Sequence, residues 1–91
     1  MIKTKLVQDL WSAMQTLIMI ARRHDVAAII NESNCFRVIY STRITLEDMH
    51  ELQTHDPILL LVNGKPTKSK LTDEQRKYFL MLARESNAQL N

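Results

Sequence analysis

Glycine, proline and cysteine are scarce in this 91-residue sequence, which has one glycine, two prolines and one cysteine. This scarcity leaves little room for long irregular loops. A glycine-rich phosphate-binding loop is excluded, because such loops need several glycines. The lone Cys35 cannot form a disulfide within one chain, so we predict a reducing compartment and a cytoplasmic protein. The apolar runs are all too short to span a membrane, and we expect no membrane partner.

A large surplus of one charge sign is also lacking. The 12 Lys and Arg residues oppose 10 Asp and Glu residues, for a net charge of +2. A dedicated nucleic-acid module usually carries a larger and more clustered basic excess. Overall charge therefore does not identify a class of partner, and any such evidence must come from local patches.

The residues that carry metal or nucleophilic chemistry do not form a motif. His24, His50 and His55 lack the i,i+4 spacing of helical zinc ligands, and the sequence has no C-x-x-C pair. Cys35 comes without a recognisable base and orienting group, which a nucleophilic cysteine requires. We therefore predict no metal, no cofactor and no enzymatic activity.

Hydrophobic residues make up 45% of the chain, which is typical of a globular domain, and the length predicts a single domain over residues 1–91. Apolar periodicity and β-branched runs predict three helices and about three strands. The predicted order is helix 4–24, strand 26–31, strand 35–41, a short helix opening at Thr45, strand 58–62 and helix 73–88. This α-β-β-α-β-α order predicts a small α+β sandwich, with a mainly antiparallel sheet packed by helices.

Two alternatives remain open in this scheme. Residues 26–31 also fit a continuation of the first helix, since no Pro or Gly forbids it. Asn63-Gly64 is the strongest hairpin-turn dipeptide, but Pro66 cannot donate to a ladder, so any return strand is very short or an edge. Later in the chain, Thr72-Asp-Glu-Gln75 forms a capping box that opens the last helix.

The first helix carries the main interaction signal. Its apolar surface covers more than half of its circumference, which indicates packing on two sides. In a chain this small the second side is predicted to meet another copy, although a plain core role fits the same pattern. Large and adaptable side chains are favoured at interfaces. The predicted interface residues are Trp11, Met14, Ile18 and Met19.

Charge is segregated along the chain. Residues 44–56 carry four acids and no Lys or Arg, with an acidic patch at Glu47, Asp48 and Glu51. Residues 63–77 carry five basic and two acidic residues, and their basic members are candidates for nucleic-acid or other anionic contact: Lys65, Lys68, Lys70, Arg76 and Lys77. Arg22, Arg23, Arg37 and Arg43 would add to this charge if they shared its face. The bland alternative is two ordinary solvated faces.

These features favour a non-enzymatic protein–protein interaction module that binds and modulates a protein partner, with self-association as a homodimer. The alternative is a small nucleic-acid-binding regulator that uses residues 63–77. The small size, single glycine and lack of a catalytic motif are typical of accessory or regulatory proteins, for instance those of phages and plasmids.

Overall fold

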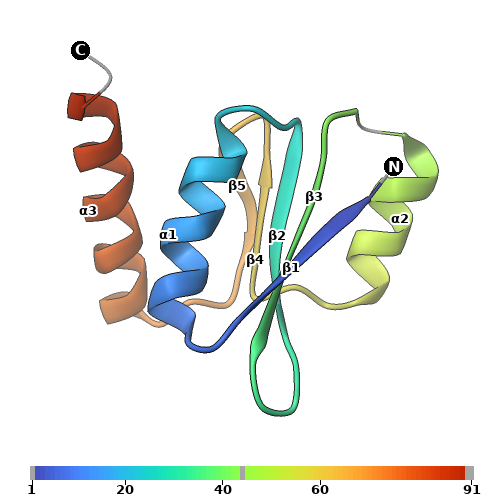
Figure 1. Ribbon diagram of the computed structural model, residues 1–91, viewed down its shortest axis with the longest axis horizontal. Helices are drawn as coiled ribbons and strands as arrows, with labels where there is room; N and C mark the ends of the chain where they lie inside the picture. The colour runs from blue at the N-terminus through green and yellow to red at the C-terminus, as the bar shows by residue number, and fades with distance from the viewer. Residues whose placement is uncertain (1, 44, 90–91) are drawn as a thin grey trace.

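A five-stranded antiparallel sheet forms the centre of the computed structural model, which describes residues 2–43 and 45–89 (Figure 1). The strands lie in the order β1-β3-β2-β4-β5. Along the chain the elements are β1 (Lys3–Val7), α1 (Leu10–Ala21), β2 (Val26–Asn31), β3 (Phe36–Ser41), α2 (Leu46–Thr54), β4 (Leu59–Val62), β5 (Lys65–Ser69) and α3 (Asp73–Gln89). No helix in the described ranges has both the length and the apolar character needed to cross a membrane.

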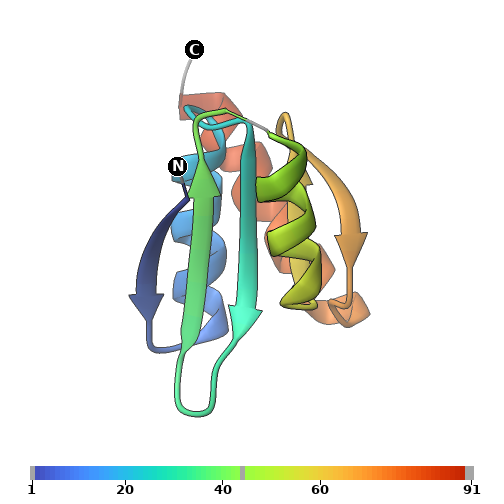
Figure 2. The same ribbon diagram turned by 90° about the vertical axis from the view of Figure 1, so that its right-hand side faces the viewer.

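The helices form layers on both faces of the sheet. α1 and α3 lie on one face and α2 lies on the other (Figure 1). Figure 2 shows that α2 lies toward β2 and β4, which leaves β1 and the start of β3 without a helix on that face, whereas Ile39 of β3 packs in the cluster around Leu52. Arg37 of β3 lies there instead, and its Nε donates to Oε1 of Glu32 at 2.5 Å. This uncovered part of the sheet therefore carries an ion pair, and beside it lies the exposed Leu6 of β1, which pairs with Arg37.

Strand alternation builds two hydrophobic clusters, one on each face of the sheet. Toward α1 and α3, the fully buried Met14 and Leu17 pack with the inward side chains of β2, β3 and β4, together with Phe79 of α3. Toward α2, Leu52 packs on the opposite side chains of the same strands. β2 contributes to both clusters, and Val26–Ile30 are all buried. These residues form a strand, so the strand prediction is confirmed over the helix alternative.

The α+β class and the antiparallel sheet are confirmed, but the prediction of about three strands and the order α-β-β-α-β-α were not exact. The two strands outside the predicted order are the sheet edges: β1 was not predicted, and β5 was left open as a very short or edge return strand. β1 was assigned to the first helix because Leu6 and Val7 continue its apolar spacing. Asp9 ends that continuity by capping α1, since its Oδ1 accepts from the Ser12 backbone N at 2.7 Å. β5 has no apolar residue and all of its side chains are exposed, so periodicity cannot reveal it.

Local turn and cap chemistry follows the sequence closely. Asn63 and Gly64 both have positive φ, 53° and 78°, as the tight β4–β5 hairpin turn requires. The capping box forms in full, because the Gln75 backbone N donates to the Thr72 hydroxyl at 3.2 Å and Thr72 N donates to Oε1 of Gln75 at 2.9 Å. The return strand β5 is an edge, as predicted from Pro66, and its pairing shows a register shift between Leu60 and Leu61.

Candidate binding surfaces

The second apolar side of α1 faces α3 of the same chain. The two helices run side by side in the same direction (Figure 1). Near one end the Trp11 and Tyr78 rings meet edge to face, and near the other end a guanidinium N–H of Arg22 donates to the Ser86 carbonyl O at 2.9 Å. The wide apolar surface of α1 is thus explained by the sheet on one side and α3 on the other. The observation that motivated a second copy has an explanation within one chain.

The four predicted interface residues of α1 occupy different environments. Met14 is 0% exposed and belongs to the core. Ile18 is half-buried between α1 and α3, and Trp11 keeps 43% of its surface exposed beside Tyr78. Met19 is 70% exposed and points to solvent. Only Met19 and part of Trp11 therefore present substantial apolar surface to a partner.

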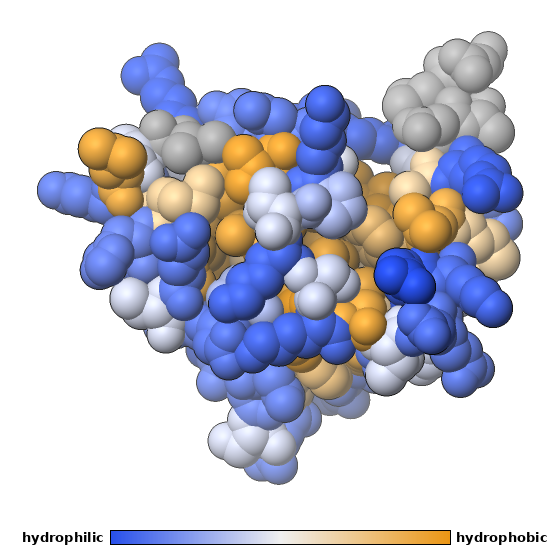
Figure 3. Space-filling view, turned by 180° about the vertical axis from the view of Figure 1, so that it is seen from behind, coloured by the Kyte–Doolittle hydropathy of each residue, from blue (hydrophilic) through white to orange (hydrophobic). Residues whose placement is uncertain are grey.

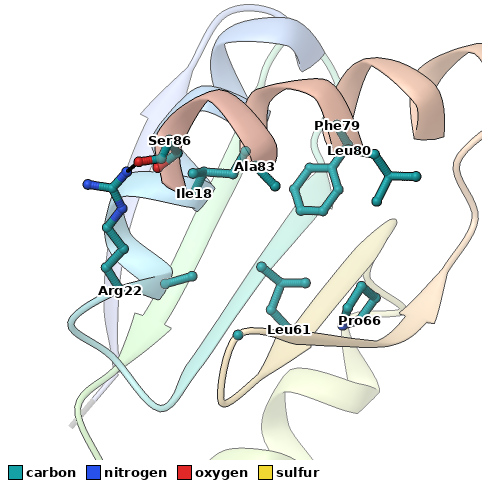
Figure 4. Close-up of a pocket in the computed structure, with 10 residues that line it drawn as sticks. Ile18, Arg22, Leu61, Pro66, Phe79, Leu80, Ala83 and Ser86 are labelled. Atoms are coloured by element: carbon teal, nitrogen blue, oxygen red, sulfur yellow. Dashed lines mark hydrogen bonds between the residues drawn. The ribbon is translucent and has the colours of Figure 1, made fainter. Parts of the chain in front are cut away.

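An apolar cleft lies between α1, α3 and the β4–β5 hairpin, with a volume of ≈ 280 Å³. Ile18 and Ala83 line it from the two helices, and Leu61 and Pro66 line it from the hairpin (Figure 4). In the same view, Phe79 and Leu80 project from α3 around the opening, while Arg22 reaches across to Ser86. Most of these lining groups are hydrocarbon, so the cleft offers dispersion contacts and few polar ones.

A second groove follows the outer line of contact between α1 and α3, which we term the seam. It has a volume of ≈ 350 Å³. Ile18 and Leu82 give it an apolar lining, and the exposed Met19 stands at its edge. Arg22 and Glu85 supply one charge of each sign. The seam is therefore a groove with an apolar lining, and its two charged residues lie near one end, where Arg22 reaches Ser86 beside Glu85.

The basic residues of 63–77 are largely paired within the chain. Asp56 forms ion pairs with both Lys68, at 3.2 Å, and Lys70. These two lysines hold the pKa of the Asp56 carboxyl below its usual range, with the Lys70 hydrogen bond as the largest cause. Arg76 pairs with Asp73 at 2.8 Å. The charge segregation seen along the sequence is thus partly closed by contacts in space.

Lys65 and Lys77 are the predicted basic residues left exposed without an ion pair in the described part of the chain. The molecule seen from behind, the side of β5, shows hydrophilic residues over much of the surface with separate hydrophobic patches between them (Figure 3).

The predicted acidic patch on α2 is also only partly exposed to solvent. Glu47 and Glu51 are exposed on α2, whereas Asp48 is half-buried near the Ser41 hydroxyl, at 3.5 Å.

The histidines and Cys35 lie on separate elements. His24 follows α1 and is half-buried, His50 and His55 are exposed in and after α2, and Cys35 is half-buried just before β3. Within 2–43 and 45–89, no three His, Cys, Asp or Glu side chains are grouped to hold a metal ion.

A basic hollow at the C-terminal end of α1 was not predicted from the sequence. This hollow has a volume of ≈ 770 Å³ and is lined by Lys5 of β1, by Arg22, Arg23 and His24, and by Tyr40 of β3. Lys5 was assigned to a helix, where its neighbours could not be foreseen. As part of β1 it pairs with Val38 on the α1 side of the sheet, beside the end of the returning helix. The spacing of Lys5 and Arg22 along the chain carries no sign of this proximity.

This chain matches no protein-family model, no curated protein and no solved structure. Its function is therefore argued from these surfaces alone.

Proposed function

We propose that the protein is a non-enzymatic binding module that receives a helix of a protein partner along the seam between α1 and α3. The observation that carries this proposal is the distribution of exposed apolar side chains. Of the six large hydrophobic residues exposed in the described chain, four lie on α1 and α3: Trp11, Met19, Leu80 and Met81. Met19 lines the seam and Leu80 lines the adjoining cleft, and exposed apolar side chains on one layer of a fold are typical of an interaction surface.

A helix suits the shape of the seam. Two helices that lie side by side leave a groove between their ridges, and a third helix packs into such a groove through its own rows of side chains. Ile18 and Leu82 supply the apolar floor, and Met19 is an unbranched side chain that adapts to different partners. Arg22 and Glu85 at the edges would orient the incoming helix by charge.

The other predicted functions have weaker support. A homodimer on α1 was motivated by its wide apolar surface, which α3 now accounts for. Nucleic-acid binding through 63–77 relied on five basic residues, and three of them, Lys68, Lys70 and Arg76, are ion-paired within the chain. We keep the cytoplasm as the proposed compartment because the chain has a single cysteine.

The proposal is tested by placing a photo-cross-linking amino acid at Met19 or Glu85 in the seam, in cells that produce the protein. Gln53, which is exposed on α2, is the matched control position. We expect the same discrete protein to cross-link from both seam positions and not from position 53. The Met19→Asp variant, cross-linked from position 85, should lose that product because a carboxylate cannot be buried against an apolar helix face.

Light scattering after size exclusion separates the alternatives. A dimeric mass that falls to a monomer in Met19→Asp, with cross-links only to a second copy, would replace the proposed partner by self-association. Equal cross-linking from positions 19, 85 and 53 would remove the seam as the binding surface.

A further inference from the structure

We propose that the basic hollow at the C-terminal end of α1, which shares Met19 and Arg22 with the seam, binds a small phosphate-bearing ligand. Three elements converge on it: Lys5 from β1, Arg22 and Arg23 from the end of α1, and Tyr40 from β3. No Asp or Glu is among the residues that line it. Lys5, Arg22 and Arg23 give the lining three positive charges that face one volume.

These charges are not neutralised by the rest of the described chain. Lys5 and Arg23 form no ion pair with any residue in 2–43 or 45–89. Arg22 donates to the Ser86 carbonyl O at 2.9 Å, but a carbonyl is uncharged and leaves the guanidinium its full charge. Like charges held around one hollow repel each other. A bound anion would be attracted to all three cations, and this attraction would offset their mutual repulsion.

Complementing the negative end of α1 explains only part of this arrangement. Cations stabilise a helix C-terminus, and the His24 ring caps α1 when its Nδ1–H donates to the Ile20 carbonyl O, at 2.9 Å. That role accounts for His24 and for one arginine. It does not explain the presence of Lys5, which reaches the same hollow from strand β1. The convergence of separate elements is what indicates a ligand.

The chemistry of the lining favours phosphate. Guanidinium groups match the tetrahedral oxygens of phosphate with paired N–H donors, and two arginines are present. The hydroxyls of Thr16 and Tyr40 add donors for the remaining oxygens. Met19 and the His24–Tyr40 aromatic pair, with ring centroids 4.8 Å apart, provide an apolar wall for the group attached to the phosphate.

A nucleic-acid strand fits the surface less well than a small ligand. A strand needs a continuous basic track along its backbone. Lys5 lies on the β1 edge of the sheet and Lys65 lies on the opposite β5 edge, and the cleft between α1, α3 and the hairpin is lined mostly by apolar residues. The volume of ≈ 770 Å³ lies within the range of small-molecule sites.

The test is a two-dimensional NMR titration of the ¹⁵N-labelled full chain with ATP and, separately, with inorganic tripolyphosphate. We expect saturable shifts centred on the amides of Thr16, His24 and Tyr40. The Lys5→Gln, Arg23→Gln double variant should weaken binding at least about tenfold, because it removes two charge-assisted contacts. The Lys65→Gln, Lys77→Gln double variant changes net charge equally and should stay within about twofold of the wild type.

All four substitutions affect exposed side chains, and the amide spectrum of each free variant verifies its fold. Equal affinity for ATP and tripolyphosphate assigns recognition to the phosphates, and tighter ATP binding assigns part of it to the apolar wall; both support the site. Equal weakening in the two double variants, or shifts centred elsewhere, would overturn it. So would a single-stranded oligonucleotide that binds more tightly than ATP and depends on Lys65 and Lys77.

Discussion

The Trp11 and Tyr78 rings stand edge to face, with centroids 4.6 Å apart and planes at 86°. This contact joins α1 to α3 across the outside of the core, whereas α3 contributes only Phe79 to the buried cluster among its described residues. Attachment of α3 therefore depends on a small number of side chains. The seam and the apolar cleft both exist because α3 is held in this position.

Removing the Tyr78 ring should loosen that attachment. Tyr78→Ala is expected to lower the free energy of unfolding by about 2 kcal/mol, from lost apolar area and the lost edge-to-face contact. Trp11 is the only tryptophan, so its emission should shift to the red as water reaches the indole. Tyr78→Phe is the control, because it keeps the ring and loses only the 3.5 Å Gln15 contact. Unchanged Trp emission in Tyr78→Ala would contradict this account.

Both faces of the sheet should contribute to one cooperative fold. Leu17→Ala, on the buried side of α1, and Leu52→Ala, on the buried side of α2, each remove a fully buried side chain. Each should lower the free energy of unfolding by about 3 kcal/mol. Leu46→Ala is the matched control, because Leu46 is 92% exposed at the start of α2 and its loss should change little. Urea titration of the three variants measures these differences. If Leu52→Ala behaved like Leu46→Ala, α2 would not be packed as described.

The ion pairs of Asp56 predict a specific pH response. Lys70 and Lys68 stabilise the ionised carboxyl and lower its pKa below the ordinary value of 3.8. A carboxyl with a depressed pKa in the folded state stabilises the fold above its unfolded pKa. That contribution is lost as the pH falls through the folded pKa. Carbon-detected NMR titration should therefore place the Asp56 midpoint below 3.8, and Lys68→Gln with Lys70→Gln should return it upward. An identical midpoint in the wild type and this double variant would show that the pairs do not persist in solution.

Substitution of Gly64, the only glycine, tests the backbone conformation of the hairpin turn. Gly64 has φ of 78°, and a Cβ built there meets no atom within 4 Å, so conformational strain is the only direct cost of Gly64→Ala. We expect a loss of about 1 kcal/mol in the free energy of unfolding. Lys65→Ala, the next residue, is the control and should be close to neutral. A neutral Gly64→Ala would argue against the left-handed conformation at this position.

Much of the fold follows from short-range rules. Helix caps and turns depend on residues three or fewer positions apart. The capping box of Thr72 and Gln75 and the hairpin turn at Asn63 and Gly64 can therefore be predicted from the sequence. The dense apolar runs of β2 and β4 predict buried segments, although residues 26–31 also fit a continuation of the first helix until the fold is known. The edge strands are harder to predict from apolar periodicity, because an edge strand needs only backbone partners and its side chains are free to be polar.

The candidate surfaces depend on contacts that no local rule reveals. Lys68 and Lys70 look free in the sequence, and only the fold brings Asp56 to them. Lys5 and Arg23 look unrelated, and only the antiparallel return of α1 along β1 brings them to one hollow. Charge in a sequence is thus a poor guide to charge on a surface whenever partners are distant along the chain.

The order of strands in the sheet also bears on how the chain is made. β2 is buried along almost its whole length, yet one of its two edges is covered only by β4, which follows after α2. During synthesis, residues 26–31 therefore leave the ribosome before residues 59–62 are made. Until then the backbone groups along one edge of β2 are unpaired and its apolar side chains are incompletely covered. A nascent chain stalled before β4 should be the form of this protein that chaperones bind and that aggregates most readily.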